Sequence, residues 1–464
     1  MGIVLLISIL LLAPVPSWAE PSAVTVSMVS ANSIDKELPF VVLTGGAWQP
    51  EYRAEYVKIH IFPDSETVLS GFEVESCRAS LRRFSVYVNY DEALLYAGGT
   101  EEKKDTRYYN LNESTLTVKQ RFDKPLPVRS LTFNFEQNVD LCIAQIRLLD
   151  RNGTPLAVKT PRVTDGTVAA TSTLDPALSY DVMNLFDSRF EYAWASNKKA
   201  TGVDLTFNFA QEESVEKIMI WNGYQRSDVH CQANSRVKTL RLTGDNSYET
   251  TLTVSDQMGS QVLDLPKPFK GKRLTLSVVE AYTGKTYEDL VISELRFYDG
   301  NRWFMLNPLA SIHAVTAHNR NEFEKAGLAH VLNQQLETDY DFGWLLRLRA
   351  DGTVYIQGSE SVRLKKANMR FISGLGNYEV LSSGREKGIK LRIFGFLRES
   401  LERVVFDCNG CGRDCNTSKT DPKIRERIFQ QYVSLKAIDE KRIRLTNESP
   451  VKKLKFKDVE LYKF

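Results

Sequence analysis

Short runs in which apolar and polar residues alternate recur along almost the whole chain. Examples are RFSVYVNY, SLTFNFEQ, GVDLTFNF, KRLTLSVVE, GIKLRIFGF and KRIRLTN, and each is bounded by Gly, Pro, Asn, Asp or Ser. Because successive side chains of a β-strand point to opposite faces, this alternation predicts half-buried strands. Many short strands between turn residues are typical of sandwiches and barrels. The sequence therefore predicts a mostly β protein.

Helical spacing of apolar residues is clear in only one segment, residues 319–337 (NRNEFEKAGLAHVLNQQLE). Its apolar positions recur at helical spacing from Phe323 to Leu332. A weaker pattern of the same kind occupies residues 421–432 (DPKIRERIFQQY). We therefore expect one helix in the last third of the chain and regard the second segment as a weaker candidate.

An internal repeat relates the first and second thirds of the chain. The stretch from Gly46, GAWQPEYRAEYVKIHIFPDSETVLSGFEVESC, parallels the stretch from Tyr192, YAWASNKKATGVDLTFNFAQEESVEKIMIWNGY. Both contain Ala-Trp, a loop, a strand, an acidic turn and a second strand. A further pair of stretches, from Phe122 and from Leu265, shares Lys-Pro, a basic strand, a loop, an Asp and a closing strand. Self-similarity of this kind indicates two copies of one structural unit.

The length of 464 residues is too great for a single core, since cores stop growing at roughly 250 to 300 residues. Together with the repeat, it predicts two related sandwiches at residues 30–155 and 170–305, joined by a linker rich in Thr, Pro and Gly. Residues 310–464 would form a C-terminal domain.

The C-terminal domain begins with the predicted helix and continues as strands separated by turns such as Asp351-Gly352 and Gly376-Asn377. This order predicts an antiparallel β-meander, a small barrel or a half-barrel, with one flanking helix. Gly343-Trp344 and the stretch ADGTVYIQG give this part a weak resemblance to lipocalins. Such a barrel could hold a small ligand or simply close a core.

The second unit carries the motifs NLFDSRFEYAW (residues 184–194), LTFNF, IMIWNGY, NSRVK and YEDLVISELRFY. With them it resembles the discoidin-like, galactose-binding-like jelly rolls, and in particular the glycan-binding type that also occurs in a streptococcal NAD-glycohydrolase toxin. The first unit is similar more loosely, since VDLCIAQIRL stands where the second has EDLVISELRF. The resemblance implies jelly-roll sandwiches whose loops at one end bind sugars without catalysis.

The resemblance also implies a structural calcium ion near the first loop of the second unit, with Asp187 and Glu294 as carboxylate donors. Residues 188–192 (SRFEY) depart from the family's calcium loop, which continues with a small residue, another Asp and a Thr. Because calcium prefers roughly six to eight oxygen ligands, calcium binding is left open. In the first unit, residues 76–78 (SCR) replace Asn-Gly-Tyr, so we expect that copy to have lost ligand residues.

The candidate site lies in the stretch KIMIWNGYQRSDVHCQANSRVKTLRL, residues 217–242, where a polar, aromatic loop separates two strands. Sugar recognition needs a ring against the apolar face of a pyranose, and planar amide or guanidinium groups for its hydroxyls. The alternative is that the tryptophans pack in the core and that the Asn-Gly pair only forms a turn. The predicted ligand-binding residues are Trp194 and Tyr224 as platform, Asn222, Arg226, His230 and Asn234 as hydrogen-bonding groups, and Tyr282 and Tyr287 in a loop that the resemblance places nearby.

The chain contains 6 cysteines, which fit an oxidising compartment where disulfides persist. Cys77 and Cys142 lie at strands of the first unit, so a disulfide between them is expected. The remaining cysteines are Cys231 and the cluster Cys408, Cys411 and Cys415 in FDCNGCGRDCN, which favour a bond within the cluster or one to Cys231. A metal site with a fourth ligand from Cys231, His313 or His318 is the alternative, although zinc is usually held by paired dyads.

The first residues, MGIVLLISILLLAPVPSWAEPS, combine an apolar run, prolines and a small-x-small pattern before Glu20. They predict a secretory signal peptide at residues 1–19, with an uncleaved membrane anchor as the alternative. No later stretch approaches the roughly 20 apolar residues that span a bilayer. We therefore expect a secreted protein, or one of the periplasm or cell envelope.

Charge and motifs narrow the function. With 60 basic and 58 acidic residues, no global field attracts nucleic acid. The 5 histidines form no HExxH motif, and no nucleophile elbow or phosphate-binding loop is present. The sequence predicts a non-catalytic carbohydrate-binding protein, with a glycan and, in addition, an envelope protein as partners. A structural or protein-interaction module without sugar binding is the main alternative, and an enzyme sited in the C-terminal domain is a third hypothesis.

Overall fold

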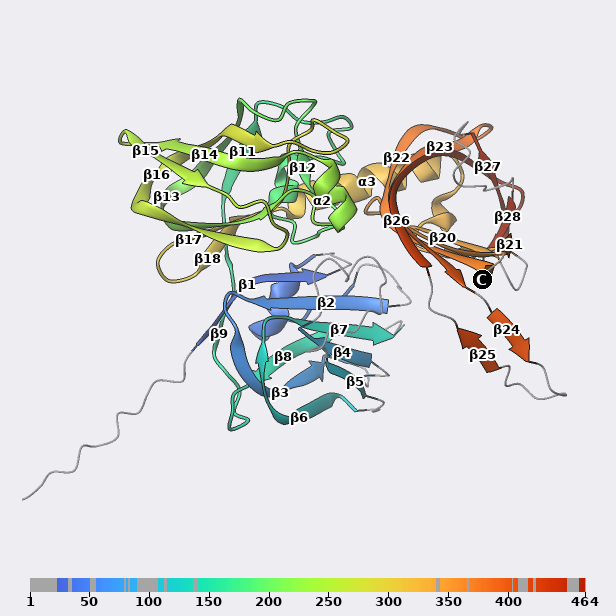
Figure 1. The fold of residues 1–464 in the computed structure, drawn as a ribbon, viewed down its shortest axis with the longest axis horizontal. Helices are drawn as coiled ribbons and strands as arrows, with labels where there is room; N and C mark the ends of the chain where they lie inside the picture. Colours follow the sequence, from blue (N-terminus) through green and yellow to red (C-terminus); the bar gives the residue numbers. More distant parts are fainter. Residues whose placement is uncertain are drawn as a thin grey trace, which may run out of the picture.

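The computed structural model has three β-rich units that meet at a common junction (Figure 1). Among the residues that the structure describes, no helix is both long and apolar enough to cross a membrane. The predicted signal peptide and the cluster at Cys408, Cys411 and Cys415 lie outside them and stay predictions. The described residues are 23–31, 36–50, 56–78, 81, 84–89, 107–111, 115–136, 141–338, 343–364, 367–402, 404–407, 416–419, 423–448 and 459–463.

The first unit is a sandwich of a six-stranded and a three-stranded sheet around an apolar core. In this core Phe72 and Phe133 pack edge to face, with ring centroids 5.2 Å apart. The larger sheet has the order β5 (Arg107–Leu111), β4 (Phe84–Val88), β7 (Leu131–Glu136), β2 (Tyr56–Pro63), β1 (Val24–Ala31) and β9 (Val158–Lys159). The smaller sheet has the order β6 (Thr117–Val128), β3 (Thr67–Ser76) and β8 (Ile143–Leu149), and a short 3-10 helix, η1, spans Pro39–Leu43.

The predicted disulfide of the first unit is confirmed. Cys77 follows β3 and Cys142 precedes β8, and the two Cα atoms lie 5.3 Å apart. Because β3 and β8 are paired in the smaller sheet, the bond closes the end of an existing ladder.

The second unit is a nine-stranded sheet that folds over its own core. Its longest strands are β13 (Val203–Asn222) and β16 (Ser260–Tyr282), and the register between them shifts between Asn208 and Glu213. Irregularities of this kind bend a strand, so β13 pairs with one neighbour in its first half and another in its second. The other strands are β10 (Arg162–Thr164), β11 (Gly166–Ala170), β12 (Trp194–Ala195), β14 (Arg236–Gly244), β15 (Tyr248–Thr253), β17 (Val291–Tyr298) and β18 (Trp303–Leu306), with the helices η2 (Val182–Leu185) and α2 (Asp228–Ala233).

The C-terminal unit is a closed antiparallel barrel, which is one of the alternatives that the sequence left open. Its apolar interior follows from the alternation of side chains along the strands. Leu346 pairs with Ile356 and Leu348 with Val354, and all four residues belong to the barrel core. The resemblance to lipocalins is not confirmed. The barrel strands are β19 (Gln335–Glu337), β20 (Trp344–Leu348), β21 (Thr353–Leu364), β22 (Ala367–Gly384), β23 (Gly388–Glu402), β26 (Lys423–Ala437), β27 (Arg442–Asn447) and β28 (Val459–Lys463). A hairpin of β24 (Val404–Asp407) and β25 (Asn416–Lys419) projects from the barrel (Figure 1).

The helix of this unit, α3 (Leu309–Lys325), begins and ends earlier than the sequence predicts. It ends where Gly327 adopts a positive φ of 71°. There the Gly327 N–H donates to Glu324 O at 2.9 Å and the Leu328 N–H donates to Phe323 O at 2.8 Å, the two bonds of a Schellman motif. After it come a 3-10 turn, η3 (Ala329–Val331), and the strand β19.

The second helical candidate, residues 421–432, is wrong, because residues from Lys423 onward form β26. On this strand Phe429 pairs with Gly395 and Val433 with Leu391, both of β23. The alternation of Phe429 and Val433 toward the barrel core therefore outweighs the local helical pattern.

The three units meet around one apolar cluster. Phe62 of β2 packs against Phe190 of the second unit, with ring centroids 6.2 Å apart. The same cluster contains Met28 from the first unit, Met219, Trp221 and Trp303 from the second, and Leu375 from the barrel. The loop around Phe190 therefore lies between both neighbouring units, so a site built on this loop is a site at a domain junction.

A candidate recognition site at the domain junction

The loop after β13 is shaped by one glycine. Gly223 has φ of 80°, and an added Cβ would come within 3.0 Å of Arg236 Cγ and Cδ and lie 3.0 Å from Cys231 Sγ. The chain then enters α2, whose first turn is capped because Ser227 Oγ accepts a hydrogen bond from the His230 N–H at 3.2 Å. This local structure gathers the predicted site residues at one end of the sandwich.

Asn222 serves the fold of this end. Its Nδ2 donates to Val237 O at 2.8 Å and its Oδ1 accepts from the Val237 N–H at 2.9 Å. Because both amide groups are bonded to β14, this buried side chain acts as a clamp between strands. A ligand contact of Asn222 stays a prediction, and both of its amide groups are engaged within the fold.

Tyr224 and Arg226 are together, as the sequence predicts, but both are buried. The Arg226 guanidinium lies 4.5 Å from the centre of the Tyr224 ring. Tyr224 donates its hydroxyl proton to Glu191 O at 2.9 Å. Arg226 Nη2 donates to Glu191 O and to Asn377 Oδ1 of the barrel. The predicted open rim is thus a sealed contact with the barrel wall.

His230 and Asn234 are also buried. The His230 ring lies 5.2 Å from the Tyr224 ring and 6.2 Å from that of Phe396 of the barrel, centroid to centroid. Burial, and then the charge of Arg226, hold the pKa of His230 well below its ordinary value, so the ring is neutral. Asn234 Nδ2 donates to His230 O at 2.8 Å and ends α2.

The loop that carries Tyr282 and Tyr287 lies beside α2, as the resemblance implies, since the Tyr287 N–H donates to Ala233 O at 2.8 Å. Trp194 is fully buried in the core, as is Trp221, which agrees with the alternative interpretation of the tryptophans. Tyr282 donates to Val254 O at 3.1 Å and is half-buried. Tyr287 is 42% exposed, which leaves it free to meet a ligand.

The sequence missed a buried ion pair at this end, which comes from the first loop. Arg189 Nη2 donates to Asp351 Oδ2 at 2.8 Å, and each side chain is only 2% exposed. Tyr192 donates to Asp351 O, and the Arg189 guanidinium lies 4.7 Å from the centre of the Tyr192 ring. Although burial acts to raise it, the pKa of Asp351 is lowered by Arg189 and Arg349. The signal was in residues 188–192, where charged and aromatic residues replace the family's calcium loop.

The carboxylates expected to bind calcium do lie together. Asp187 Oδ1 and Glu294 Oε1 both accept from the Arg189 N–H at 2.8 Å, and Arg296 Nη1 donates to Glu294 Oε2 at 2.9 Å. Burial, and then the neighbouring Glu294, raise the pKa of Asp187 well above its ordinary value. In the described part of the chain, no group of at least 3 His, Cys, Asp or Glu residues could hold a metal ion. Asp187 and Glu294 supply two carboxylates, fewer than the roughly six to eight oxygens that calcium takes.

A small hollow remains between the first loop, α3 and the barrel. It is lined by Asn184, Asp187, Arg189, Tyr192, Ser311, Ile312, Val315 and Asp351. This lining shows that the helix connecting the second unit to the barrel takes part in the junction.

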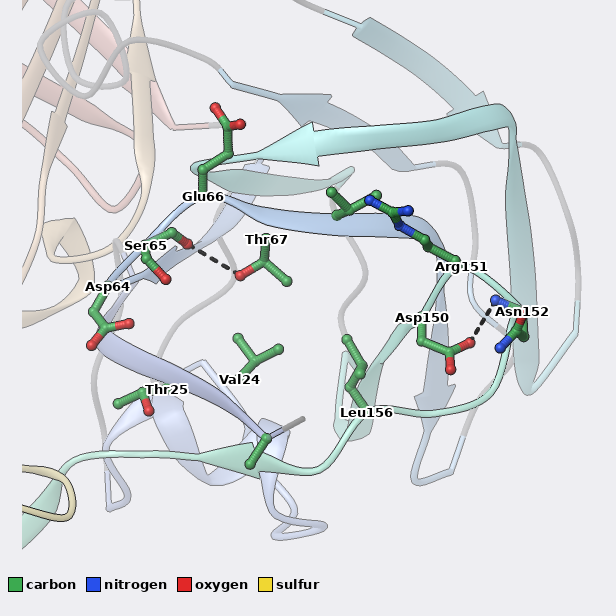
Figure 2. Close-up of a pocket in the computed structure, with 12 residues that line it drawn as sticks. Val24, Thr25, Asp64, Ser65, Glu66, Thr67, Asp150, Arg151, Asn152 and Leu156 are labelled. Atoms are coloured by element: carbon green, nitrogen blue, oxygen red, sulfur yellow. Dashed lines mark hydrogen bonds between the residues drawn. The ribbon is translucent and has the colours of Figure 1, made fainter. Parts of the chain in front are cut away.

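A larger, open hollow lies on the first unit, where the sequence predicts no site (Figure 2). It is formed by the turn after β2, the loop after β8 and the start of β1. Asp150 Oδ1 accepts from the backbone N–H groups of Asn152 and Thr154 at 2.8 Å, and Thr67 Oγ1 donates to Ser65 O at 3.1 Å. These polar groups therefore hold the turns themselves.

Cys231 differs from the prediction. It is a free thiol, buried beside Gly223. Burial raises its pKa to about 11. An uncharged thiol of this kind packs like a small apolar side chain, so a disulfide from Cys231 to the C-terminal cluster is corrected.

Comparison with known proteins gives one family match. Residues 160–298 match the model of the NAD glycohydrolase translocation F5/8 type C domain. No curated protein sequence is significantly similar to the chain.

Among solved structures, the CBM32-1 and CBM32-2 domains of Clostridium perfringens ZmpB, in complex with GalNAc, are 10% identical. That likeness covers 59% of this chain and 90% of the other, with a TM-score of 0.23. The family 32 CBM of Clostridium perfringens NanJ, in complex with galactose, is 17% identical over 28% of this chain and 90% of the other, with a TM-score of 0.23. A fucolectin from Morone saxatilis (striped bass) is 8% identical over 57% and 94%, with a TM-score of 0.22. Likenesses at these scores do not establish a shared ligand.

Proposed function

We propose that residues 160–298, a discoidin-like domain, act as a non-catalytic recognition module. Its loops at residues 187–192 and 223–234, called the loop end below, hold the C-terminal barrel of the same chain. This proposal develops the structural alternative to sugar binding, because the surface that is held belongs to the same chain. The observation that carries it is the Arg189 to Asp351 ion pair, in which each side chain is 2% exposed.

The physical argument rests on desolvation. Removing one partner of a buried ion pair typically costs about 3 to 5 kcal/mol, because the other charge is left without a counterion. Around this pair the loop end adds Tyr192, which donates to Asp351 O, and Arg226, which donates to Asn377 Oδ1. Tyr180 stacks on Phe394 of the barrel, with ring centroids 6.1 Å apart. Such a set of contacts supports a specific docking surface.

A catalytic role for the polar groups of this end has less support. Ser227 Oγ and His230 Nδ1 are 2.9 Å apart. However, Ser227 is also the N-cap of α2, and the neutral His230 is packed between Tyr224 and Phe396. The family match is to a translocation domain. The pair is therefore interpreted as part of a helix cap.

Docking is tested by hydrogen exchange on the full chain. The double variant Asp351→Ala/Asn377→Ala should speed amide exchange in residues 187–192 at least tenfold, because it removes both side-chain acceptors on the barrel wall. Asp439→Ala, which breaks an exposed pair with Arg442 at another turn of the barrel, is the matched control. Unchanged protection in the double variant would reject the docking proposal.

A second candidate function is glycan binding at the same end. Arg226 is 1% exposed, yet its Nε and Nη1 have no hydrogen-bond partner. Planar donors next to aromatic rings are what sugar recognition uses, and Tyr224 and His230 supply such rings. Because Phe396 and Asn377 now meet these groups, a glycan would have to displace the barrel wall.

Glycan binding is tested on an array with the full chain and with the Asp351→Ala/Asn377→Ala variant. The variant should give the stronger signal, and Tyr224→Ala in that background should remove it. A blank array for both proteins, with hydrogen exchange confirming release of the loop end, would contradict this candidate.

We also propose that the protein works outside the cytoplasm, as secreted or in the periplasm or cell envelope. The Cys77 to Cys142 disulfide fits an oxidising compartment. An envelope protein as partner stays a proposal, and its test is cross-linking of the full chain in whole cells.

A further inference from the structure

We infer that the loop end of the discoidin-like domain selects acidic, N-acylated glycans, because the barrel wall presents a carboxylate and an amide carbonyl to it. This inference deepens the second candidate function and rests on it. In the folded chain, the Asp351 carboxylate and the Asn377 amide of the barrel occupy the site where a ligand would bind. These two groups therefore indicate which ligand groups the loop end accepts.

The carboxylate subsite is built on Arg189. Asp351 Oδ2 accepts from Arg189 Nη2 at 2.8 Å, while the guanidinium lies 4.7 Å from the centre of the Tyr192 ring. A guanidinium recognises carboxylates by charge-assisted hydrogen bonds, and the ring limits its orientation. Arg189 Nε has no hydrogen-bond partner, so a ligand carboxylate could accept from both nitrogens where Asp351 accepts from one.

The amide subsite is built on Arg226. Its Nη2 donates to Asn377 Oδ1, a carbonyl of the same chemistry as the acetamido group of an N-acetylated sugar. Asn377 Nδ2, Arg226 Nε and Arg226 Nη1 are buried without partners. The barrel wall therefore fills this subsite incompletely, and a ligand that supplies further acceptors could compete with it.

The two subsites belong to one surface. On the barrel, Thr353 pairs with Asn377 across the ladder, and Thr353 Oγ1 donates to Asp351 Oδ1 at 2.7 Å. On the opposite side, Glu191, two residues beyond Arg189, accepts from Arg226 through its carbonyl. The carboxylate and the amide that occupy the subsites are thus neighbours, as in a single sugar or a disaccharide.

The local charge also favours an acidic ligand. Without the barrel, the cations facing this end would be Arg189, Arg226 and Lys58 of the first unit, which interacts with Glu191. Glu294 is paired with Arg296, so Glu191 and Asp187 are the carboxylates opposing the three cations. Without the barrel, the net charge of the loop end would therefore be positive.

The rings complete the site. Tyr180 and His230 contact Phe394 and Phe396 of the barrel, with centroids 6.1 Å and 6.2 Å apart. When the barrel wall moves away, the apolar face of a pyranose can take the place of these phenylalanine rings.

The test uses four oligosaccharides and the full chain. Sialyllactose carries both a carboxylate and an acetamido group, N-acetyllactosamine carries only the acetamido group, a glucuronide of lactose carries only the carboxylate, and lactose carries neither. Binding is measured by calorimetry with the natural chain, with Asp351→Ala/Asn377→Ala and with the control Asp439→Ala. Sialyllactose should bind the double variant at least tenfold more tightly than lactose, and more tightly than it binds the other two proteins.

A conservative variant separates recognition from folding. Arg189→Lys in the double-variant background keeps the positive charge but loses the planar guanidinium that can donate two parallel hydrogen bonds. It should reduce the preference for sialyllactose over N-acetyllactosamine several-fold. Where the double variant does not fold by circular dichroism, Asn377→Ala alone serves. Equal affinity for all four sugars would overturn the inference and leave glycan binding intact. Failure of every sugar to bind a released loop end would overturn both.

Discussion

At the scale of single residues, the partners of a side chain decide its role. Asn222 and Arg226 are four residues apart and both suit a sugar site. Asn222 meets Val237, which is close in sequence, whereas Arg226 meets Asn377, 151 positions away. The sequence could group these residues in one loop because their spacing is local. It could not predict the barrel wall in front of them.

The Arg189 to Asp351 pair yields a stability prediction. Arg189→Ala should lower the free energy of unfolding by about 3 to 5 kcal/mol, because Asp351 is left as a buried, unpaired carboxylate. Arg189→Ala/Asp351→Ala should lose less than the sum of the single variants, as measured by urea unfolding. The exposed Arg442 to Asp439 pair is the control, with a loss of about 0 to 1 kcal/mol for Arg442→Ala. Strict additivity at the buried pair would show that the two charges do not interact.

Asp187 yields a prediction about pH. Burial and Glu294 raise the pKa of Asp187 in the folded protein, while an unfolded Asp titrates at about 3.9. The folded chain therefore holds this proton more tightly, so the stabilisation is complete below about pH 3.9 and is lost as the pH rises through the folded pKa. Asp187→Asn keeps a donor and an acceptor without titrating. Its urea midpoint should fall less than that of the natural chain between pH 4 and 8, and parallel curves would contradict the assignment.

At the scale of elements, local signals predicted strands better than helix ends. Alternation identified β23 and β27 because each strand has one apolar face. Residues 421–432 read as a weak helix because Ile424 and Ile428 are spaced four apart, as on one face of a helix. Pairing with β23 determined the outcome. Gly327 is typical of a helix C-terminus, but the predicted helix continued through it to residue 337, whereas α3 ends at Lys325.

Gly327 supports a matched comparison. It adopts φ of 71°, and an added Cβ would meet nothing within 4 Å, so Gly327→Ala changes backbone strain alone. We expect a loss of about 1 to 2 kcal/mol in the free energy of unfolding, because a left-handed backbone disfavours Cβ. Gly384, at the end of β22, also has open space but no positive φ. Gly384→Ala should therefore be neutral or stabilise by up to about 1 kcal/mol, and equal losses in the two variants would refute the argument.

At the scale of the whole molecule, three units share one junction. The apolar cluster joins Met28 and Phe62 of the first unit to Phe190 of the second and Leu375 of the barrel. Lys58 adds a half-buried charge to the same place, where desolvation lowers its pKa. Since each unit contributes to this centre, the loop end of the discoidin-like domain is determined by all three.

The disulfide yields a prediction for one unit. Cys77→Ser/Cys142→Ser should lower the free energy of unfolding of the first sandwich by about 2 to 4 kcal/mol, because the bond restricts the unfolded chain over a separation of 65 residues. Hydrogen exchange can follow β3 and β8 separately from β14 and β16. Cys231→Ser, which alters a free thiol of the second unit, is the control for loss of a cysteine as such. Equal loosening of both sandwiches would show that the disulfide stabilises the junction as well.

Sequence patterns alone predicted the mostly β class, the repeated sandwich and the discoidin-like character of the second unit, and they indicated the Cys77 to Cys142 bond, whose connectivity the structure then fixed. Each of these depends on patterns within a strand or within a repeat, and period-two alternation is a local property. Whether the polar, aromatic loop after β13 faces solvent could be learned only from the folded chain. Burial of a loop depends on what packs against it, and here the covering groups are Asp351, Asn377 and Phe396, which lie far along the chain on the barrel.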